Sequence, residues 1–405
     1  DYVDLYTLGE ITIGKNAGTA ITTGDRNVGV GHQALLANTV GSRSVAVGHN
    51  SLSAQNPASA TDMYNTAVGH EAGASITTGI QNTAIGALAL DANTTANGNT
   101  AVGSSALGAN TTGNLNTALG QKALEDNTVG DRSVAVGYNA LNAQNPTSNV
   151  DMYNTAIGYS AGANVTTGIQ NAFVGALSSD AQTSADGCTA LGYAALTDNQ
   201  TGDDNTAVGK FALANATGAA NTAVGVNTGD IITSGTANVL FGYGTDGASA
   251  TDNSQHGFGY NLSCAASFTT LGNASADCRV AHGAATWATV SDERVKKDIE
   301  DSTAGLSFIN DLRPKTFKYK TLGEIPSDFD YYEEGSTEHF KNNSRTNHGF
   351  IAQEVKTAID NHPELKDGFE LWNVRTSGQQ EVAEAALIPI LVKALQEADD
   401  KIDAL

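Results

Sequence analysis

The chain has 405 residues, of which 40% are apolar and 6% aromatic, with 44 glycines, 21 basic and 43 acidic side chains and a net charge of -22. So few aromatic residues among so many glycines argue against one thick core and favour a thin, repetitive architecture for part of the chain. The acidic balance also argues against a nucleic-acid partner, because neutralising phosphates requires clustered Lys and Arg.

No run of 18 apolar residues occurs, so the sequence predicts no segment inserted into a membrane. The first residues lack both a basic and an apolar stretch and no Met begins them, so we expect a processed or truncated chain. The three cysteines show no CxxC spacing, which predicts neither a zinc site nor a disulfide framework. Cys264 and Cys278 are the candidate pair, but three small buried thiols are the favoured interpretation.

The composition changes near residue 290. Residues 1–290 carry 7 basic side chains, 20 acidic ones and 38 glycines, whereas residues 291–405 carry 14, 23 and 6. A Gly-, Ala-, Thr- and Asn-rich part is thus followed by a part of ordinary globular composition. We expect an N-terminal leading segment at 1–26, a repeat shaft at 27–272, a linker at 273–290 and a small domain at 291–405.

The first part of the chain is repetitive. A five-residue unit of the form Asn-Thr-Ala-Val-Gly recurs from Gly31 to Gly242, mostly in steps of 17 residues, with two steps of 21 and one of 16. Both 21-residue steps carry the same insert, which starts at Ala54 and again 89 residues later at Ala143. A block of 89 residues has therefore been duplicated. A constant short period means that each unit must stack on its neighbours to bury its apolar face.

One unit is typical of one coil of a β-solenoid or β-roll. In residues 44–48 branched residues alternate with Ala at the period of a strand, and Gly48 lets the chain turn. A following Ala-Leu pair such as Ala34 and Leu35 supplies a second apolar contact, and an Asn-Thr-Thr-Gly turn closes the coil. At about 4.8 Å per stacked strand, such a rod is roughly 60 Å long. One Val and one Leu per coil is a small core, so we expect several chains to associate side by side.

The repeats over about residues 16–272 resemble the head repeats of trimeric autotransporter adhesins, whose Asn/Ser-x-Ala-Ile/Val-Gly units form a left-handed β-roll that trimerises. The period of 17 departs from the shorter one usual there, which leaves the direction and register of the roll open. The resemblance implies a mainly β, homotrimeric shaft.

Residues 291–405 predict a small α+β domain. We expect a helix at 303–311 ended by Pro314, a strand at 316–319, a strand or turn leading into a helix at 348–355, and a strand at 371–375. The last element is a helix whose apolar residues step alternately by three and four, which predicts a short coiled coil. These residues are Ile388, Leu391, Leu395, Ala398, Ile402 and Leu405.

Several blocks of this domain resemble the peptidase S74 domain, the intramolecular chaperone at the C-terminus of phage tail spikes, endosialidases and tail fibres. They are the Ser-Asp-x-Arg-x-Lys start at 291–296, Leu-x-Pro-x-x-Phe-x-Tyr at 312–319, Gly-Phe-Ile-Ala-Gln-Glu-Val at 349–355 and the closing segment 387–397. The resemblance implies that three such domains assemble, nucleate trimerisation of the shaft, and cut themselves off between Val290 and Ser291.

The same resemblance implies a Ser-Lys dyad, with Ser291 as nucleophile and Lys296 as general base. A lysine amine accepts a proton only where burial or positive neighbours favour its neutral form, and Arg294 and Lys297 are candidates for such neighbours in a trimer. Without the family context, a Ser five residues before a Lys is typical of a solvated helix start, with Ser291 as its N-cap.

These observations favour a structural trimeric fibre or adhesin of a phage tail or appendage, located on the virion, that contacts a host cell-surface receptor, a glycan being one candidate. The alternative is a bacterial trimeric surface adhesin or extracellular filament that keeps its trimerisation cap. A glycan-degrading shaft needs paired carboxylates about 5 to 9 Å apart, whereas the repeats place few acids. No cofactor or metal is predicted, and His348 and the acidic stretch 328–334 are interpreted as structural.

Overall fold

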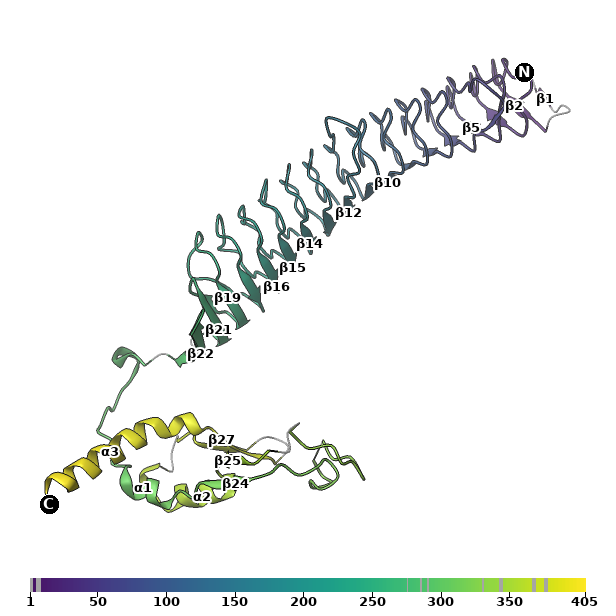
Figure 1. Cartoon of the computed structure of the whole chain (residues 1–405). Coiled ribbons are helices and arrows are strands. Elements are labelled where there is room, and N and C mark those ends of the chain that lie inside the picture. The colour runs from purple at the N-terminus through teal and green to yellow at the C-terminus, as the bar shows by residue number, and fades with distance from the viewer. Residues whose placement is uncertain are drawn as a thin grey trace. The chain divides into compact units, whose positions relative to one another are not determined.

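The computed structural model describes residues 9–274, 276–284, 286–289, 291–329, 331–341, 345–365, 369–374 and 378–405, and the backbone strand at 3–4. The chain divides into two compact units, Asp1–Val290 and Ser291–Leu405 (Figure 1). Among the described residues, no helix combines the length and apolarity that crossing a membrane requires.

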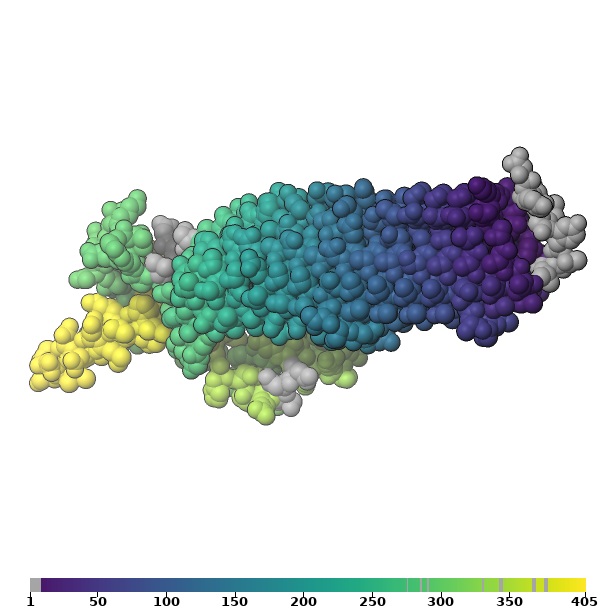
Figure 2. Space-filling view, turned by 90° about the horizontal axis from the view of Figure 1, so that it is seen from above, coloured from purple at the N-terminus to yellow at the C-terminus, as the bar shows by residue number. Residues whose placement is uncertain are grey.

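The first unit is a β-solenoid of about 15 turns, which confirms the predicted fold class. One short strand per coil pairs in parallel and in register with the strands of the coils before and after it, so the strands line one side of the unit (Figure 1). The coils pack against one another along its length (Figure 2). The stacked strands are β2 (Ile11–Ile13), β3 (Val28–Val30), β5 (Val45–Val47), β7 (Thr66–Val68), β8 (Thr83–Ile85), β9 (Thr100–Val102), β10 (Thr117–Leu119), β11 (Val134–Val136), β12 (Thr155–Ile157), β13 (Ala172–Val174), β14 (Thr189–Leu191), β15 (Thr206–Val208), β16 (Thr222–Val224), β17 (Val239–Phe241), β19 (His256–Tyr260) and β21 (Phe268–Asn273).

Antiparallel strands extend the stack at both ends. β1 (Val3–Asp4) pairs with β2, which lies inside the segment expected to lead into the shaft. After β21 the chain reverses into β22 (Ala276–Ala281) and β23 (Ala288–Thr289), within the segment expected to be a linker. Two further parallel pairs join β4 (Gly41–Ser42) to β6 (Thr61–Asp62) and β18 (Asp246–Gly247) to β20 (Ser263–Cys264).

The core of each coil differs from the one we expected. In most coils the central residue of the strand is an Ala, such as Ala67, and it is buried, as is the Leu of the Ala-Leu pair, such as Leu90. The third strand residue faces outward instead, and Val68 is 37% and Leu119 48% exposed. The expectation that this Val fills the core is therefore wrong, because strand alternation turns the central residue inward and its two neighbours outward, and Phe173 and Leu240 are buried at the same central position. The glycine after the strand allows close stacking, since a Cβ on Gly69 would lie 2.4 Å from the next coil's carbonyl oxygen.

An asparagine ladder satisfies the buried polar groups at one corner of the coils. The backbone N–H of Asn82 donates to Asn65 Oδ1 at 2.9 Å, and that of Asn99 donates to Asn82 Oδ1 at 3.0 Å. The Asn82 side-chain amide donates in turn to the Ala96 carbonyl at 2.8 Å. These side chains are buried, where an unpaired amide would be destabilising, and the repeated hydrogen bonds pair them. The ladder contains Asn27, Asn65, Asn82, Asn99, Asn116, Asn154, Asn171, Asn205, Asn221 and Asn238.

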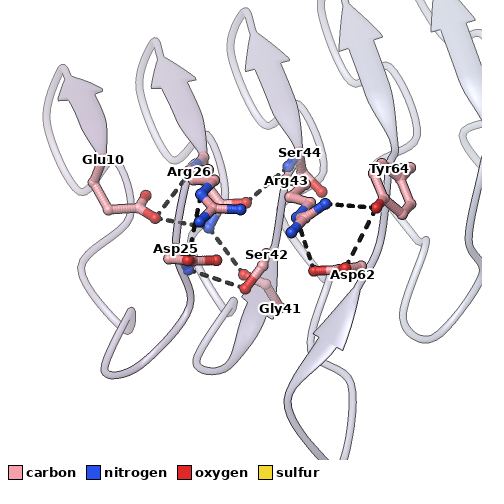
Figure 3. Close-up of polar contacts among 10 residues, drawn as sticks. Glu10, Asp25, Arg26, Gly41, Ser42, Arg43, Ser44, Asp62 and Tyr64 are labelled. Atoms are coloured by element: carbon pink, nitrogen blue, oxygen red, sulfur yellow. Dashed lines mark hydrogen bonds and ion pairs between the residues drawn. The ribbon is translucent and has the colours of Figure 1, made fainter. Parts of the chain in front are cut away.

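The 21-residue coils repair an interruption of this ladder. Ser44 stands where an Asn is expected, and Gln55 from the insert fills the gap, because its Oε1 accepts from Ser44 Oγ at 3.1 Å and from Asn65 Nδ2 at 3.0 Å. On the surface of the same coil Arg43 forms an ion pair with Asp62 at 3.1 Å and donates to the Tyr64 hydroxyl at 2.7 Å (Figure 3). The duplicated block repeats this brace with Arg132, Asp151 and Tyr153.

The second unit is a small α+β domain. Its elements are η1 (Glu293–Val295), α1 (Leu306–Asp311), β24 (Lys315–Phe317), β25 (Asn347–Gly349), α2 (Ala352–Asp360), η2 (Pro363–Leu365), β26 (Trp372–Val374), β27 (Gln380–Val382), η3 (Glu384–Leu387) and α3 (Ile388–Asp403). β24 pairs with β25 and β26 with β27, each antiparallel. The core gathers Phe308, Val355, Ile359, Leu371, Leu387 and Ile390.

These elements follow the predicted order, but several bounds differ. The strand expected at 316–319 is β24 at Lys315–Phe317, and the helix expected to end at 355 continues to Asp360. α1 starts at Leu306 instead of 303, because the Glu397 carboxylate of α3 accepts from the Leu306 N–H at 2.8 Å and serves as its cap. β27 was not predicted, and Arg375, expected to end the preceding strand, falls in a part that the structure leaves undescribed.

The closing helix α3 has two apolar faces. Ile390 and Ala394 are buried against the domain's own core, as α3 packs on α1. The predicted heptad positions lie on the other side, where Leu395 is 70% and Ile402 67% exposed. A single chain therefore leaves the coiled-coil seam without a partner.

Candidate functional site

The candidate dyad lies at the start of the second unit. η1 is capped by Asp292, whose carboxylate accepts from the Arg294 N–H at 2.9 Å. The N-cap is therefore Asp292, not Ser291, because the chain enters the turn one residue later than the helix-start interpretation assumed. The turn of η1 brings Lys296 back toward the preceding residues, and its Nζ donates to Ser291 Oγ at 2.7 Å.

The electrostatics of a single chain do not yet activate this pair. Ser291 and Lys296 are both exposed. The Asp292 carboxylate binds the Arg294 guanidinium, and this hydrogen-bonded pair lowers the pKa of Asp292 and raises that of Arg294. The charge expected from Arg294 is thus already compensated. A lysine acts as general base only where burial or uncompensated positive neighbours favour its neutral form, and Lys296 is exposed here.

Two exposed apolar side chains lie close to the candidate dyad in the sequence. Val295, within η1, is 71% exposed, and Ile299, just beyond it, is 62% exposed. Exposed branched residues beside a Ser-Lys contact offer a surface that would exclude water from it once covered. Val290, the residue on the other side of the predicted scissile bond, lies outside the described residues.

The other candidates from the sequence lie apart from this pair. His348 is exposed in the middle of β25, and Asp330 of the acidic stretch is not among the described residues. Cys264 and Cys278 are free thiols, so the alternative of a disulfide between them is wrong. Burial raises the pKa of the Cys264 thiol to about 11, so it is an unreactive core group.

Sequence reasoning missed His362. Its ring is buried, with Nε2 2.9 Å from Asp311 Oδ2 and Nδ1 3.0 Å from Glu364 Oε1, and it packs edge-on against Phe308. Burial alone lowers the pKa of His362, but the two carboxylates outweigh it and raise that pKa above its usual value. No spacing in the sequence announces this contact, because Asp311 lies 51 residues away.

The comparison with protein families matches residues 291–363 to the model described as Peptidase_S74, chaperone of endosialidase. The match includes Ser291, Lys296 and His362 and stops before α3. No significant match to a curated protein or to a solved structure was found.

The second unit therefore carries a chaperone-of-endosialidase domain. Together with the long β-solenoid shaft before it, this domain fits a phage tail fibre with a C-terminal chaperone domain.

Proposed function

We propose that this protein is the shaft of a trimeric phage tail fibre or appendage, assembled on its C-terminal chaperone domain, which then cuts itself off between Val290 and Ser291. The observation that carries the proposal is the 2.7 Å contact between Lys296 Nζ and Ser291 Oγ, within a domain that matches the chaperone family and adjoins a solenoid.

Two unpaired apolar surfaces support trimerisation. The outward third residues of the strands form an apolar stripe along the solenoid, and the heptad seam of α3 forms another. Apolar patches of this extent are uncommon on monomers and mark surfaces that other protein covers. The stripe includes Val68, Ile85, Leu119, Ile157, Val174, Leu191 and Phe258, and the seam includes Ile388, Leu391, Leu395, Ile402 and Leu405.

The repeat explains why a chaperone is useful. Successive coils present nearly the same outer strand, for instance Thr66–Val68 and Thr83–Ile85, so a shift of one coil between chains gives an alternative pairing of similar quality. Long-range pairing of this kind is slow and prone to kinetic traps. A globular trimeric nucleus that aligns the three chains would select the correct register, and its removal would leave a kinetically stable shaft.

The chemistry that we propose needs water as its only co-reactant. Lys296, once neutral, takes the proton of Ser291 Oγ, and this oxygen attacks the carbonyl carbon of Val290. An ester bond forms as the Val290–Ser291 C–N bond breaks, and the departing Ser291 amine takes the proton from Lys296. Water then hydrolyses the ester, which yields a carboxylate on Val290 and restores the Ser291 hydroxyl.

For the receptor we propose a glycan that binds to exposed tyrosines. The residue after each repeat glycine lies in a column on the surface, and in the second half this column holds Tyr138, Tyr159, Tyr193, Tyr243 and Tyr260. Tyr138 stacks on Tyr159, and Tyr243 on Tyr260, with ring centroids 5.4 Å apart in each pair. Half-exposed aromatic rings of this kind present an apolar face and a polar tip, which suits sugar rings.

The test of self-cleavage is the mass of the denatured protein after expression. The wild type is expected to yield fragments 1–290 and 291–405, whereas Ser291→Ala and Lys296→Ala remain intact. Lys297→Arg is the matched control, since it changes a neighbouring exposed lysine but keeps its positive charge, and it is expected to cleave. An intact wild type that forms trimers would contradict self-cleavage and leave the domain as a permanent trimerisation cap.

A further inference from the structure

The same column holds three histidines in the first half of the solenoid. His32, His49 and His70 each follow a repeat glycine, and their rings stack with centroids 5.1 Å apart between successive members. The backbone sets this spacing, because the Asn50 N–H donates to the His32 carbonyl at 2.9 Å and the Glu71 N–H donates to the His49 carbonyl at 2.8 Å. Coil stacking thus brings together side chains that are 17 and 21 residues apart.

An acidic side chain completes the group at one end of the column. His49, His70 and Glu71 each offer one ligand atom, and these atoms all lie within 4.8 Å of one another. His70 Nε2 is 3.9 Å from Glu71 Oε1, which also accepts from Asn50 Nδ2 at 3.4 Å. Asn50 follows His49 at the position that Glu71 takes after His70, so the carboxylate distinguishes the pair of His49 and His70 from the pair of His32 and His49.

We propose that His49, His70 and Glu71 bind one divalent transition-metal ion, for which Zn²⁺ is the probe. Two imidazoles and one carboxylate with an open fourth position form a common zinc ligand set, with metal–ligand distances of about 2.0 to 2.2 Å. To bind one ion, the three ligand atoms must come closer together than they are here. Rotation of the side chains can bring them together, because both imidazoles are exposed. The ion would join the coil that starts after Gly48 to the coil that starts after Gly69, across the longer 21-residue step.

The duplication supplies a matched control inside the same chain. At the positions 89 residues further on stand Tyr138, Tyr159 and Ser160, which offer no such ligand set. Tyr138 stacks on Tyr159 in the way that His49 stacks on His70, and the Ser160 N–H donates to the Tyr138 carbonyl at 2.9 Å. The coil therefore accepts either set of side chains with the same backbone hydrogen bond.

The test is isothermal titration calorimetry. The full chain is first freed of metal with a chelator and is then titrated with Zn²⁺. We expect one site per chain in the wild type and, in the triple variant His49→Tyr, His70→Tyr and Glu71→Ser, an affinity at that site lower by at least about tenfold. The reciprocal triple variant Tyr138→His, Tyr159→His and Ser160→Glu is expected to contain two sites per chain. Circular dichroism verifies that both variants keep the β-solenoid.

Two outcomes would overturn the assignment. One is the same zinc affinity and stoichiometry in the wild type and in the triple variant that removes the histidines. The other is loss of the site in His32→Gln, which copies Gln121 of the second block, while His70→Tyr retains it. Cobalt titration provides a second readout, since Co²⁺ in a tetrahedral site with two imidazoles absorbs in the visible and the triple variant is expected to lack that band.

Discussion

Lys296 Nζ lies 2.7 Å from Ser291 Oγ, and the one-turn helix η1 between the two residues creates the contact. Asp292 caps this turn, so the serine hydroxyl is left to meet the lysine. The cap and the contact between Ser291 and Lys296 are thus parts of one local structure.

The dyad makes a prediction about proton transfer. Lys296→Arg keeps a positive charge beside Ser291 but cannot give up its proton, because a guanidinium stays charged at any accessible pH. We therefore expect this variant to trimerise and to remain uncleaved when its denatured mass is measured. Lys297→Arg is the control and should cleave as the wild type does. Cleavage of Lys296→Arg at the wild-type rate would exclude Lys296 as the base.

The exposed seam of α3 makes a prediction about assembly. Leu395→Glu places a charge at the seam position that is 70% exposed in the single chain, so it should prevent trimers while leaving the domain's own core intact. Light scattering after size exclusion is expected to report monomers. The denatured mass is expected to be that of the intact chain, since the proposed cleavage depends on assembly. Gln396→Glu changes the neighbouring exposed residue and should stay trimeric. Trimers of Leu395→Glu would show that the seam is not the assembly surface.

The asparagine ladder predicts a stabilising substitution. Cys188 occupies a ladder position, where its N–H donates to Asn171 Oδ1 at 2.8 Å. Its thiol makes weak sulfur contacts, with the Gly202 carbonyl at 3.3 Å, the Asp186 carbonyl at 3.6 Å and Asn199 Nδ2 at 3.6 Å. Cys188→Asn restores the amide and should raise the unfolding free energy by about 1 kcal/mol. Asn171→Cys, the opposite exchange one coil earlier, should lower it by about 1 to 2 kcal/mol. If the urea unfolding midpoints of both variants moved in the same direction, the ladder would not be the cause of the stability changes.

Asp246 predicts how stability depends on pH. Burial, and then the hydrogen bond and charge of Asp230, raise the pKa of Asp246 to about 8. The folded state therefore favours the protonated acid, and the stability this contributes is present below about pH 4 and lost as the pH rises through about 8. The melting temperature should fall across this window, and Asp246→Asn should melt higher than the wild type at pH 8. Asp126→Asn, at an exposed turn, is the control, and an equal gain there would refute the explanation.

The period of the coils and the order of the elements could be predicted from the sequence, because their signals are repeated or local. The recurring glycine and the alternation within residues 44–48 predicted one strand per coil, and the in-register strands confirm the solenoid. The blocks around 291–296 and 349–355 predicted the chaperone family, which the match to 291–363 confirms. The pairing of Ser291 with Lys296 as nucleophile and base stays a prediction.

Only the tertiary structure decided which side of each strand faces inward. Alternation is symmetric, so a sequence of Thr-Ala-Val allows Ala or Val inside, and the path of the coil turned Ala67 inward and left Val68 outside. It also decided which distant residues meet. His49 and His70, like Asp311 and His362, come together through stacking and packing across intervening chain, and a sequence carries no local signal of such a distance.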